Sequence, residues 1–399
     1  MKNAINYYYD IYVNDIVKTE KDYYFYYDNE EYHFVIFNRP LDDIKPLYEL
    51  NVEMLNYNVL SHKIILNKNN EILTTLNDVS YMLIKNCNYK NKFVFINDLV
   101  YLQKKTAYIK YNDELLRNNW VKMWSDKIDY YEYQISQFGK KYPILCDSLS
   151  YYIGMGENAI SYLKNNYKME NDFDKNSLVV SHKRINVVEG SFEFYNPLNY
   201  IIDSRVRDVS EYIKNRFFYQ NLNFYEIRTY MDYASFDKNE YILLFSRLLF
   251  PTYYFDVYDD IINNNLKEEK IISIINKNEL YEQFLVIVYN YIVKEKNIFI
   301  EPIEWLIKWY FYFSFISLTS NTSGISDVKI SSTVSLIVES EKIQLEQLPS
   351  NFIYTVPFSS SNLINSTSPP SLIRNGLIFS ITNFIFSIMS IKFVPFIFN

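Results

Sequence analysis

Glycine is scarce in this chain: only six of its 399 residues are glycine, and none lies between residues 10 and 30. A loop that holds phosphate through its backbone N–H groups needs several glycines close together, because side chains would keep the ligand away. The sequence therefore excludes a glycine-rich phosphate loop from the N-terminal region.

The chain also has only two cysteines, Cys87 and Cys146, and three histidines, His33, His62 and His182. The cysteines lack the spacing of a zinc site and are too few for a disulfide framework, and the histidines lie far apart in the sequence. We therefore expect no metal site built from cysteine and histidine. Any metal ion would have to be held by carboxylates.

An excess of positive charge is absent as well, since the formal net charge is -7 with both signs interspersed. Recognition of nucleic acid by bulk electrostatics needs a basic face, so we expect no nucleic-acid partner. Residues 1–15 contain no apolar run behind Lys2. The sequence thus predicts no secretory signal and a cytoplasmic location.

The amino-acid composition changes abruptly near residue 318. Of 41 tyrosines only Tyr354 lies beyond this position, and all four tryptophans precede it. Residues 319–370 are rich in serine, threonine and asparagine and carry few charges, which is typical of a poorly ordered linker. We therefore treat residues 319–399 as a separate Ser/Ile/Phe-rich tail.

Residues 377–398 of this tail are rich in isoleucine and phenylalanine. One interpretation is a membrane anchor, although polar residues interrupt the run and a bilayer core requires about 20 predominantly apolar residues. The other is an out-of-frame or rearranged end, because Lys, Asn and Glu codons become Phe and Ile codons on the opposite strand. The composition favours this second interpretation, in which the tail is not native sequence.

Residues 1–104 show the pattern of an antiparallel sheet with one helix. Strand-forming residues alternate over residues 16–37 around Asp28-Asn29, which predicts a hairpin. After Pro40, apolar residues at helical spacing predict a helix: Leu47, Leu50, Met54 and Leu55. Three further strands are predicted over residues 62–66, 72–76 and 79–85.

Residues 105–318 show mainly helical periodicity. Trp120 and Trp124 lie on the apolar stripe of a helix predicted over residues 113–138, and a second helix is predicted over residues 143–165. Further helices are predicted over residues 209–220, 223–233, 238–249, 254–264, 268–275, 278–294 and 301–315. The predicted fold class is α+β, with a small antiparallel β lobe (residues 1–104) and a larger helical lobe (residues 105–318).

Residues 178–214 place charged residues next to two short strands. The β-like run Leu178–Val180 ends at Ser181-His182, and a second run, Ile201–Asp203, leads into an amphipathic helix. The charged residues around the start of this helix are Asp203, Arg205, Arg207, Asp208 and Glu211.

This order of strand, histidine loop, strand, aspartate and helix resembles the active centre of the aminoglycoside phosphotransferase and choline kinase-like superfamily. Within that superfamily the chain is similar to the bacterial spore-coat-associated kinase-like proteins. The resemblance covers roughly residues 15 to 310. It implies a two-lobed, protein-kinase-like fold.

The resemblance also implies which catalytic groups are missing. An active member has His-Gly-Asp followed five residues later by Asn, because the Asp orients the attacking hydroxyl and the Asn holds magnesium. After His182, the corresponding positions here carry Lys183, Arg184 and Glu189. The strand over residues 32–38 also lacks the lysine that would hold the α and β phosphates. We therefore expect a degenerate loop without confident catalytic residues.

Several roles remain open at this stage. His182 is either the loop histidine of the family or a buried histidine of the core. Asp203 is either a magnesium ligand, with Lys183 near the phosphates of a nucleotide, or a structural turn residue. For the remaining charged residues we expect structural roles: Arg205 and Arg207 in a salt-bridge cluster, and Asp208 as an N-cap or first-turn carboxylate paired with Glu211.

The sequence supports three functional hypotheses. The favoured one is a non-catalytic, kinase-like protein (a pseudokinase) without cofactor, which binds an unknown protein partner or takes part in assembly, as the spore-coat resemblance implies. The second is a phosphotransferase that acts on the alcohol group of a small molecule with ATP and Mg²⁺ at a relocated site. The third is a tail-anchored, membrane-associated protein, and it depends wholly on residues 319–399.

Overall fold

The computed structural model of the protein describes residues 1–19, 22–87, 93–167, 178–185, 191–263, 266–303 and 305–306. Residues Met1–Ile300 form one compact unit, and Glu301–Asn399 form a second. The tail predicted over residues 319–399 lies outside the described residues, as does most of the helix predicted over residues 301–315. The fold below is that of Met1–Ile300.

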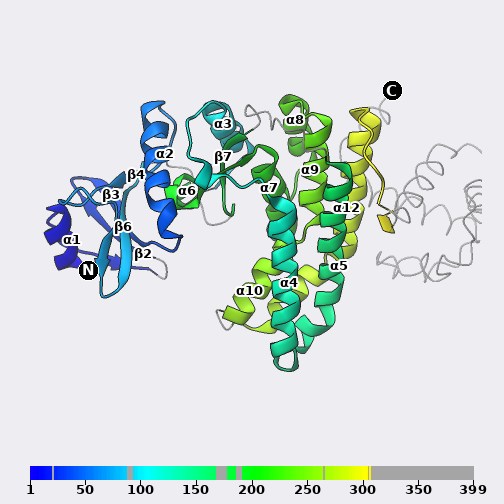
Figure 1. Ribbon diagram of the computed structural model, residues 1–399, viewed down its shortest axis with the longest axis horizontal. Helices are drawn as coiled ribbons and strands as arrows, with labels where there is room; N and C mark the ends of the chain where they lie inside the picture. Colours follow the sequence, from blue (N-terminus) through cyan, green and yellow to red (C-terminus); the bar gives the residue numbers. More distant parts are fainter. Residues whose placement is uncertain are drawn as a thin grey trace, which may run out of the picture. The chain divides into compact units, whose positions relative to one another are not determined.

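Six antiparallel strands form the N-terminal sheet in the order β1-β2-β3-β6-β4, with β5 paired to β6 (Figure 1). Their bounds are Val17–Lys18 (β1), Asp22–Tyr27 (β2), Glu30–Ile36 (β3), Lys63–Ile65 (β4), Thr74–Leu76 (β5) and Val79–Lys85 (β6). The predicted hairpin is confirmed: β2 and β3 are joined by Asp28 and Asn29, whose φ angles of 52° and 61° fit a two-residue hairpin turn. The strand predicted over residues 79–85 is also confirmed as β6, which pairs with β3 in the same antiparallel sheet.

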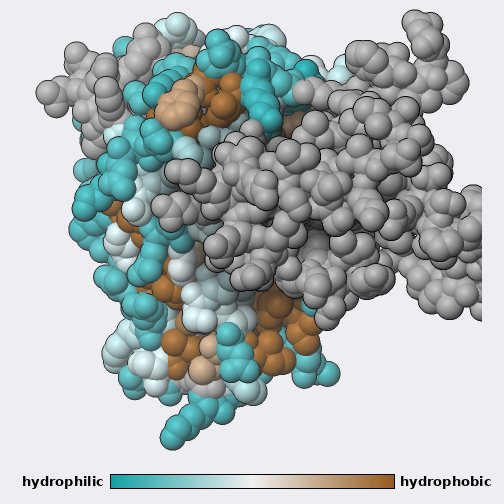
Figure 2. Space-filling view, turned by 90° about the vertical axis from the view of Figure 1, so that its right-hand side faces the viewer, coloured by the Kyte–Doolittle hydropathy of each residue, from teal (hydrophilic) through white to brown (hydrophobic). Residues whose placement is uncertain are grey.

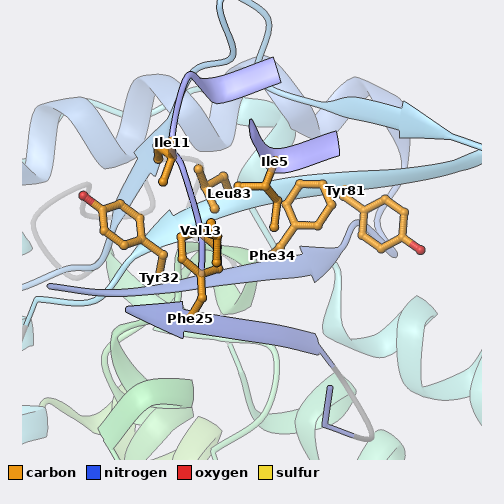
Figure 3. Close-up of a cluster of buried hydrophobic side chains, with 8 residues drawn as sticks. All are labelled: Ile5, Ile11, Val13, Phe25, Tyr32, Phe34, Tyr81 and Leu83. Atoms are coloured by element: carbon orange, nitrogen blue, oxygen red, sulfur yellow. The ribbon is translucent and has the colours of Figure 1, made fainter. Parts of the chain in front are cut away.

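The core of the sheet lies beneath a short N-terminal helix, α1 (Lys2–Tyr9), that the sequence did not predict. Figure 3 shows Ile5 of α1 pointing toward Phe34 and Tyr81 of the sheet, and Ile5 is fully buried. The rings of Phe34 and Tyr81 stack with their centroids 4.7 Å apart. The whole cluster consists of Ile5, Ile11, Val13, Phe25, Tyr32, Phe34, Tyr81 and Leu83.

The helix predicted after Pro40 is α2 (Ile44–Asn56), and the predicted apolar positions Leu47, Leu50 and Met54 are buried. Asn51 is buried among them, with 1% of its surface exposed. Its amide donates to Ser61 Oγ (2.8 Å) and the His62 carbonyl (2.7 Å) and accepts from the Ile64 N–H (3.0 Å). One polar side chain thus fixes α2 to the chain that enters β4.

The rest of the unit is mainly helical, and Figure 1 shows α4, α5, α9 and α12 running side by side. The helices are α3 (Ile96–Thr106), α4 (Trp120–Phe138), α5 (Pro143–Asn166), α6 (Ser191–Tyr195), α7 (Val206–Tyr219), α8 (Phe224–Ala234), α9 (Lys238–Leu249), α10 (Thr252–Asn263), α11 (Ile272–Ile275) and α12 (Asn278–Asn290). Short 3-10 turns lie at Leu41–Asp43, Asp113–Leu115, Gly139–Lys141, Pro197–Asn199 and Glu268–Ile271, and a π turn at Tyr291–Glu295. The predicted fold class, α+β with a β-rich part followed by a helical part, is confirmed.

Helix α3 was not predicted, and it packs against the helical part of the unit. Its Thr106 hydroxyl accepts the backbone N–H of Val180 (3.1 Å), and Gln103 donates to the Arg205 carbonyl (2.9 Å). The lobe boundary predicted at residue 104 therefore falls inside α3.

On the face shown in Figure 2, hydrophilic residues (teal) cover much of the described surface, and hydrophobic residues (brown) form separate groups between them. Within the described ranges, no helix combines the length and the apolar character needed to cross a bilayer.

We predict that Asn51→Ala lowers the free energy of unfolding by about 3 kcal/mol, because it leaves the Ile64 N–H buried without its partner and removes the bonds to Ser61 Oγ and the His62 carbonyl. Urea denaturation measures this change. Val52→Ala, on the exposed side of α2, is the matched control and should change the free energy by less than about 0.5 kcal/mol. Equal stability of the two variants would contradict the role assigned to Asn51.

Candidate functional site

Two short antiparallel strands carry the residues singled out from the sequence. Strand β7 (Leu178–His182) pairs with β8 (Tyr200–Ser204), with His182 opposite Tyr200, and every residue of both strands is buried. Helix α7 begins directly after β8, at Val206. The order of strand, loop, strand and helix expected from the sequence is therefore confirmed.

His182 is fixed through its ring and its backbone, and only 1% of its surface is exposed. Its Nδ1 lies 2.7 Å from Oδ2 of Asp208, and Nε2 lies 2.7 Å from the Phe194 carbonyl. Its backbone N–H donates to the other carboxylate oxygen of Asp208, at 3.0 Å. His182 and Asp208 thus hold the end of β7 against the first turn of α7.

The expected pair between Asp208 and Glu211 does not form. Asp208 turns toward β7, whereas Glu211 accepts from the Lys214 ammonium (2.8 Å) and the Thr252 hydroxyl (2.9 Å). Although burial favours the neutral carboxyl, the charge and hydrogen bond of Lys214, together with the charges of Arg184 and Arg207, outweigh it and lower the pKa of Glu211 to about 2. Both carboxylates of the first two turns of α7 are therefore used inside the fold.

Asp203 is enclosed by positive and N–H groups and has no exposed surface. Its carboxylate accepts from the Arg207 guanidinium (2.8 Å), from Arg247 through one nitrogen that lies 3.0 Å from both oxygens, and from the Trp120 indole N–H (3.0 Å). The backbone N–H of Ser204 adds a further bond at 2.7 Å. We call Asp203, Trp120, Arg207 and Arg247 the Asp203 cluster. It contains two cations and one carboxylate.

The sequence suggested that Arg205 and Arg207 belong to one salt-bridge cluster, but in the structure they have different partners. Arg207 belongs to the Asp203 cluster and also donates to the carbonyls of His182 (2.8 Å) and Lys183 (3.0 Å). Arg205 turns away and forms two bonds with Glu240 of α9, at 2.5 and 2.7 Å. Arg207 therefore supports the loop after β7, and Arg205 joins α7 to α9.

Arg184 occupies the loop position where an active member has its carboxylate. Its side chain is 41% exposed and contacts Asp256 of α10, with Nε–Oδ1 and Nη2–Oδ1 distances of 3.1 and 3.0 Å. The Asp256 charge raises the pKa of Arg184. The guanidinium therefore stays protonated and offers no lone pair that could accept a proton. Glu189 lies outside the described residues.

A magnesium ion does not fit this arrangement. Both oxygens of Asp203 already accept from guanidinium groups, and a second cation beside Arg207 and Arg247 would meet their repulsion. In the described part of the chain, no group of three or more His, Cys, Asp or Glu side chains could hold a metal ion.

A phenylalanine of α6 lies between two histidines of the sheet region. The Phe192 ring stacks on His33 of β3, with centroids 3.9 Å apart, and on His62, with centroids 4.6 Å apart. His62 lies 2.9 Å from the Phe192 carbonyl through Nε2 and accepts the Cys87 N–H at Nδ1 (3.1 Å). This pattern fits a neutral ring, and burial lowers the pKa of His62 to about 3.

His33 differs from His62 in its charge. It lies 2.5 Å from an oxygen of Asp22 and 2.7 Å from an oxygen of Glu31. Burial opposes protonation, but the hydrogen bonds to these two carboxylates outweigh it and raise the pKa of His33. Phe192 is therefore held between a neutral and a readily protonated ring, on the side of the sheet that faces β7 and β8.

Sequence reasoning missed Arg247, Trp120 and Phe192 as members of this region. Arg247 carried a usable signal, since it lies within the apolar run Ile242–Phe250, where an arginine must find a buried partner. Phe192 carried none, because one phenylalanine among 29 does not reveal its contacts.

The sheet order, the β7–β8 pair and the His182–Asp208 contact define a protein with the kinase-like fold of the small-molecule phosphotransferases. A family model described as "Spore coat putative kinase YutH" matches residues 2–288. The chain belongs to this family.

Two relatives illustrate the similarity. Over 214 residues the chain is 27% identical to "Endospore coat-associated protein YutH" of Bacillus subtilis (strain 168), which covers 47% of this chain and 61% of that protein. The chain thus matches less than two thirds of that relative's length. An aminoglycoside phosphotransferase from Alicyclobacillus acidocaldarius has a similar structure, with a TM-score of 0.52, 10% identity, and coverage of 73% of this chain and 96% of that one. At this identity the likeness concerns the fold alone.

We predict that Asp203→Ala lowers the free energy of unfolding by about 3–5 kcal/mol, because it leaves two buried guanidinium groups without their carboxylate. Asp256→Ala is the control, since it breaks an ion pair whose side chains are 41% and 42% exposed; it should cost no more than about 1 kcal/mol. Chemical denaturation of both variants measures the difference. A small effect at Asp203 would show that the cluster is not a structural element.

We also predict a pH effect from His62. Its pKa is 6.5 when unfolded and about 3 when folded, so at intermediate pH the unfolded chain binds a proton that the folded one does not. The free energy of unfolding should therefore fall by up to about 1.4 kcal/mol per unit as the pH drops below 6.5. His62→Gln should remove this contribution from stability curves recorded against pH.

His33→Gln is the matched control, because the pKa of His33 is raised and its contribution has the opposite sign. That contribution is fully present below pH 6.5 and is lost as the pH rises through the raised value. In a plot of unfolding free energy against pH, the slope of His33→Gln should thus differ from that of the parent above pH 6.5 and match it below pH 6.5. Identical slopes below pH 6.5 for the parent and His62→Gln would refute the assignment of a neutral His62.

Proposed function

We propose that this protein is a non-catalytic, kinase-like protein of the spore coat that acts by binding a protein partner or by assembly. The spore-coat setting comes from the descriptions of its family and of its Bacillus subtilis relative. A cytoplasmic location remains a prediction from the sequence.

The observation that carries the proposal is the engagement of Asp203. In the resemblance drawn from the sequence, this residue takes the position of the magnesium-binding aspartate. Its carboxylate is fully buried and contacts Arg207 and Arg247. Freeing it for a metal ion would leave two buried guanidinium groups uncompensated, at a cost of several kcal/mol. Since phosphoryl transfer relies on metal ions to neutralise developing charge, the site lacks its main electrostatic element.

Two further features support the same conclusion. The loop position for the group that accepts the hydroxyl proton carries Arg184, which is bound to Asp256. Strand β3 has no lysine, and its His33 is bound by two carboxylates and covered by Phe192. Three positions of a phosphotransfer site, at Asp203, at Arg184 and on strand β3, therefore carry side chains that are bound to other residues of this protein.

We predict no measurable transfer of phosphate from ATP with Mg²⁺ to sugars, aminoglycosides, choline or homoserine-like alcohols. Arg184→Asp should not restore activity, because it supplies the missing carboxylate but leaves Asp203 bound to two arginines. The measurement is ATP consumption together with ³¹P detection of a phosphorylated product. The Alicyclobacillus phosphotransferase, assayed in parallel with an aminoglycoside, serves as a positive control for the method.

ATP consumption by the purified protein that yields an identified phosphorylated product, and that Asp203→Asn abolishes without unfolding the chain, would overturn this proposal. It would favour the relocated active site instead. An antibody against the protein that finds it outside the coat fraction of spores would contradict the proposed setting.

A further inference from the structure

Three cationic residues lie around the start of β8. Arg39, Arg117 and Lys183 come from separate parts of the chain, and each bonds to a backbone carbonyl within residues 198–202, Arg39 through its guanidinium and the other two through their backbone N–H groups. The charges of Arg39 and Arg117 both act on the Lys183 ammonium. The bonds are Arg39 Nη1 to the carbonyls of Leu198 (3.1 Å) and Tyr200 (2.6 Å), the Lys183 N–H to the Asn199 carbonyl (2.8 Å), and the Arg117 N–H to the Ile202 carbonyl (2.8 Å). We call these three residues the basic cluster.

The basic cluster carries more positive than negative charge. The only carboxylate that it contacts among the described residues is Asp43, which lies 2.7 Å from Arg39 and 3.9 Å from Arg117. The Lys183 ammonium forms no hydrogen bond or ion pair with a residue in the described ranges. The nearby carboxylates Asp203 and Asp256 already pair with other arginines. Three cations thus share one carboxylate.

Lys183 is the accessible member of the cluster, because its side chain is exposed whereas Arg39 is buried. Desolvation and then the charge of Arg39 lower the pKa of Lys183, with Arg117 and Arg184 acting in the same direction and Asp43 against it. An anion bound here would relieve this repulsion. The cluster therefore has both an unmet charge and an open side.

The two arginines of the basic cluster are held in place by other groups of the protein. Arg39 is held by Asp43 and by two carbonyls. Arg117 donates to the carbonyls of Glu114 (2.8 Å) and Leu116 (3.0 Å). A receptor whose side chains are already ordered loses less conformational entropy when it binds.

We infer that the basic cluster binds a dianionic phosphate group. The excess of three cations over one carboxylate matches two negative charges, and the phosphate oxygens can accept from ammonium and guanidinium donors together. This inference rests on the proposed binding role and names the chemistry of what is bound. The phosphate can come from a phosphorylated side chain of a partner or from a free phosphate ester, and the two share this chemistry.

Calorimetric titration of the full chain tests the inference. Inorganic phosphate is added at constant ionic strength and without nucleotide or Mg²⁺. Lys183→Gln should weaken phosphate binding about tenfold, as expected for the loss of one charge-assisted bond, and Arg117→Gln should weaken it as well. Lys45→Gln is the matched control, since this lysine is 82% exposed on α2 and pairs only with the exposed Glu49 at 3.7 Å. It should leave the affinity unchanged.

Two further titrations identify the source of the phosphate. Tighter binding of N-acetyl-phosphoserine amide than of ribose 5-phosphate would point to a phosphorylated partner, and the reverse order to a free ester. Either order supports the proposed site if Lys183→Gln lowers the affinity for both ligands. Absence of phosphate binding, or equal affinity of the parent and Lys183→Gln with unchanged melting temperatures, would overturn the inference. Such a failure would not contradict the predicted absence of phosphotransfer, because phosphotransfer is measured in a separate assay with ATP.

Discussion

The helical part of the protein depends on one buried charge. Asp203 places a carboxylate in the buried interior, and Arg207 and Arg247 neutralise it. These side chains come from β8, α7 and α9, and the Trp120 indole brings in α4. In a low-dielectric interior such a network is maintained by the cost of leaving any one member unpaired, so its four elements must keep their mutual positions.

The same interaction underlies our proposal that this kinase-like fold works without the chemistry of a kinase. A metal-binding aspartate must offer oxygen lone pairs to an ion, whereas Asp203 offers them to guanidinium groups of its own chain. The loop beside it has changed in the same sense, since Lys183 and Arg184 stand where an active relative has glycine and aspartate. The proposed binding role is consistent with these extra positive charges, which repel a metal ion and attract an anion.

The sequence predicted the regular parts of this fold because their signals are local. Alternation and the Asp28-Asn29 turn revealed the hairpin, and helical spacing revealed α2. Helix α1 was missed because it is short and its packing against the sheet, rather than its own pattern, stabilises it. At the site, the position of Asp203 could be inferred from its neighbours in the sequence. The apolar run around Arg247 indicates that this arginine needs a buried partner, but it does not identify Asp203 as that partner, because contacts between distant segments leave no local pattern.

The contacts between the sheet and the segment after β7 also have a mechanical consequence. Phe192 lies between the rings of His33 and His62. The backbone N–H of His62 donates to the Tyr195 carbonyl (2.9 Å), and the Arg39 guanidinium donates to two carbonyls beside β8. Enzymes that close over a substrate need a hinge whose two sides separate at low cost. Here separation would expose stacked rings and break buried hydrogen bonds at several points. These contacts therefore oppose a hinge motion that would separate the sheet from β7 and β8.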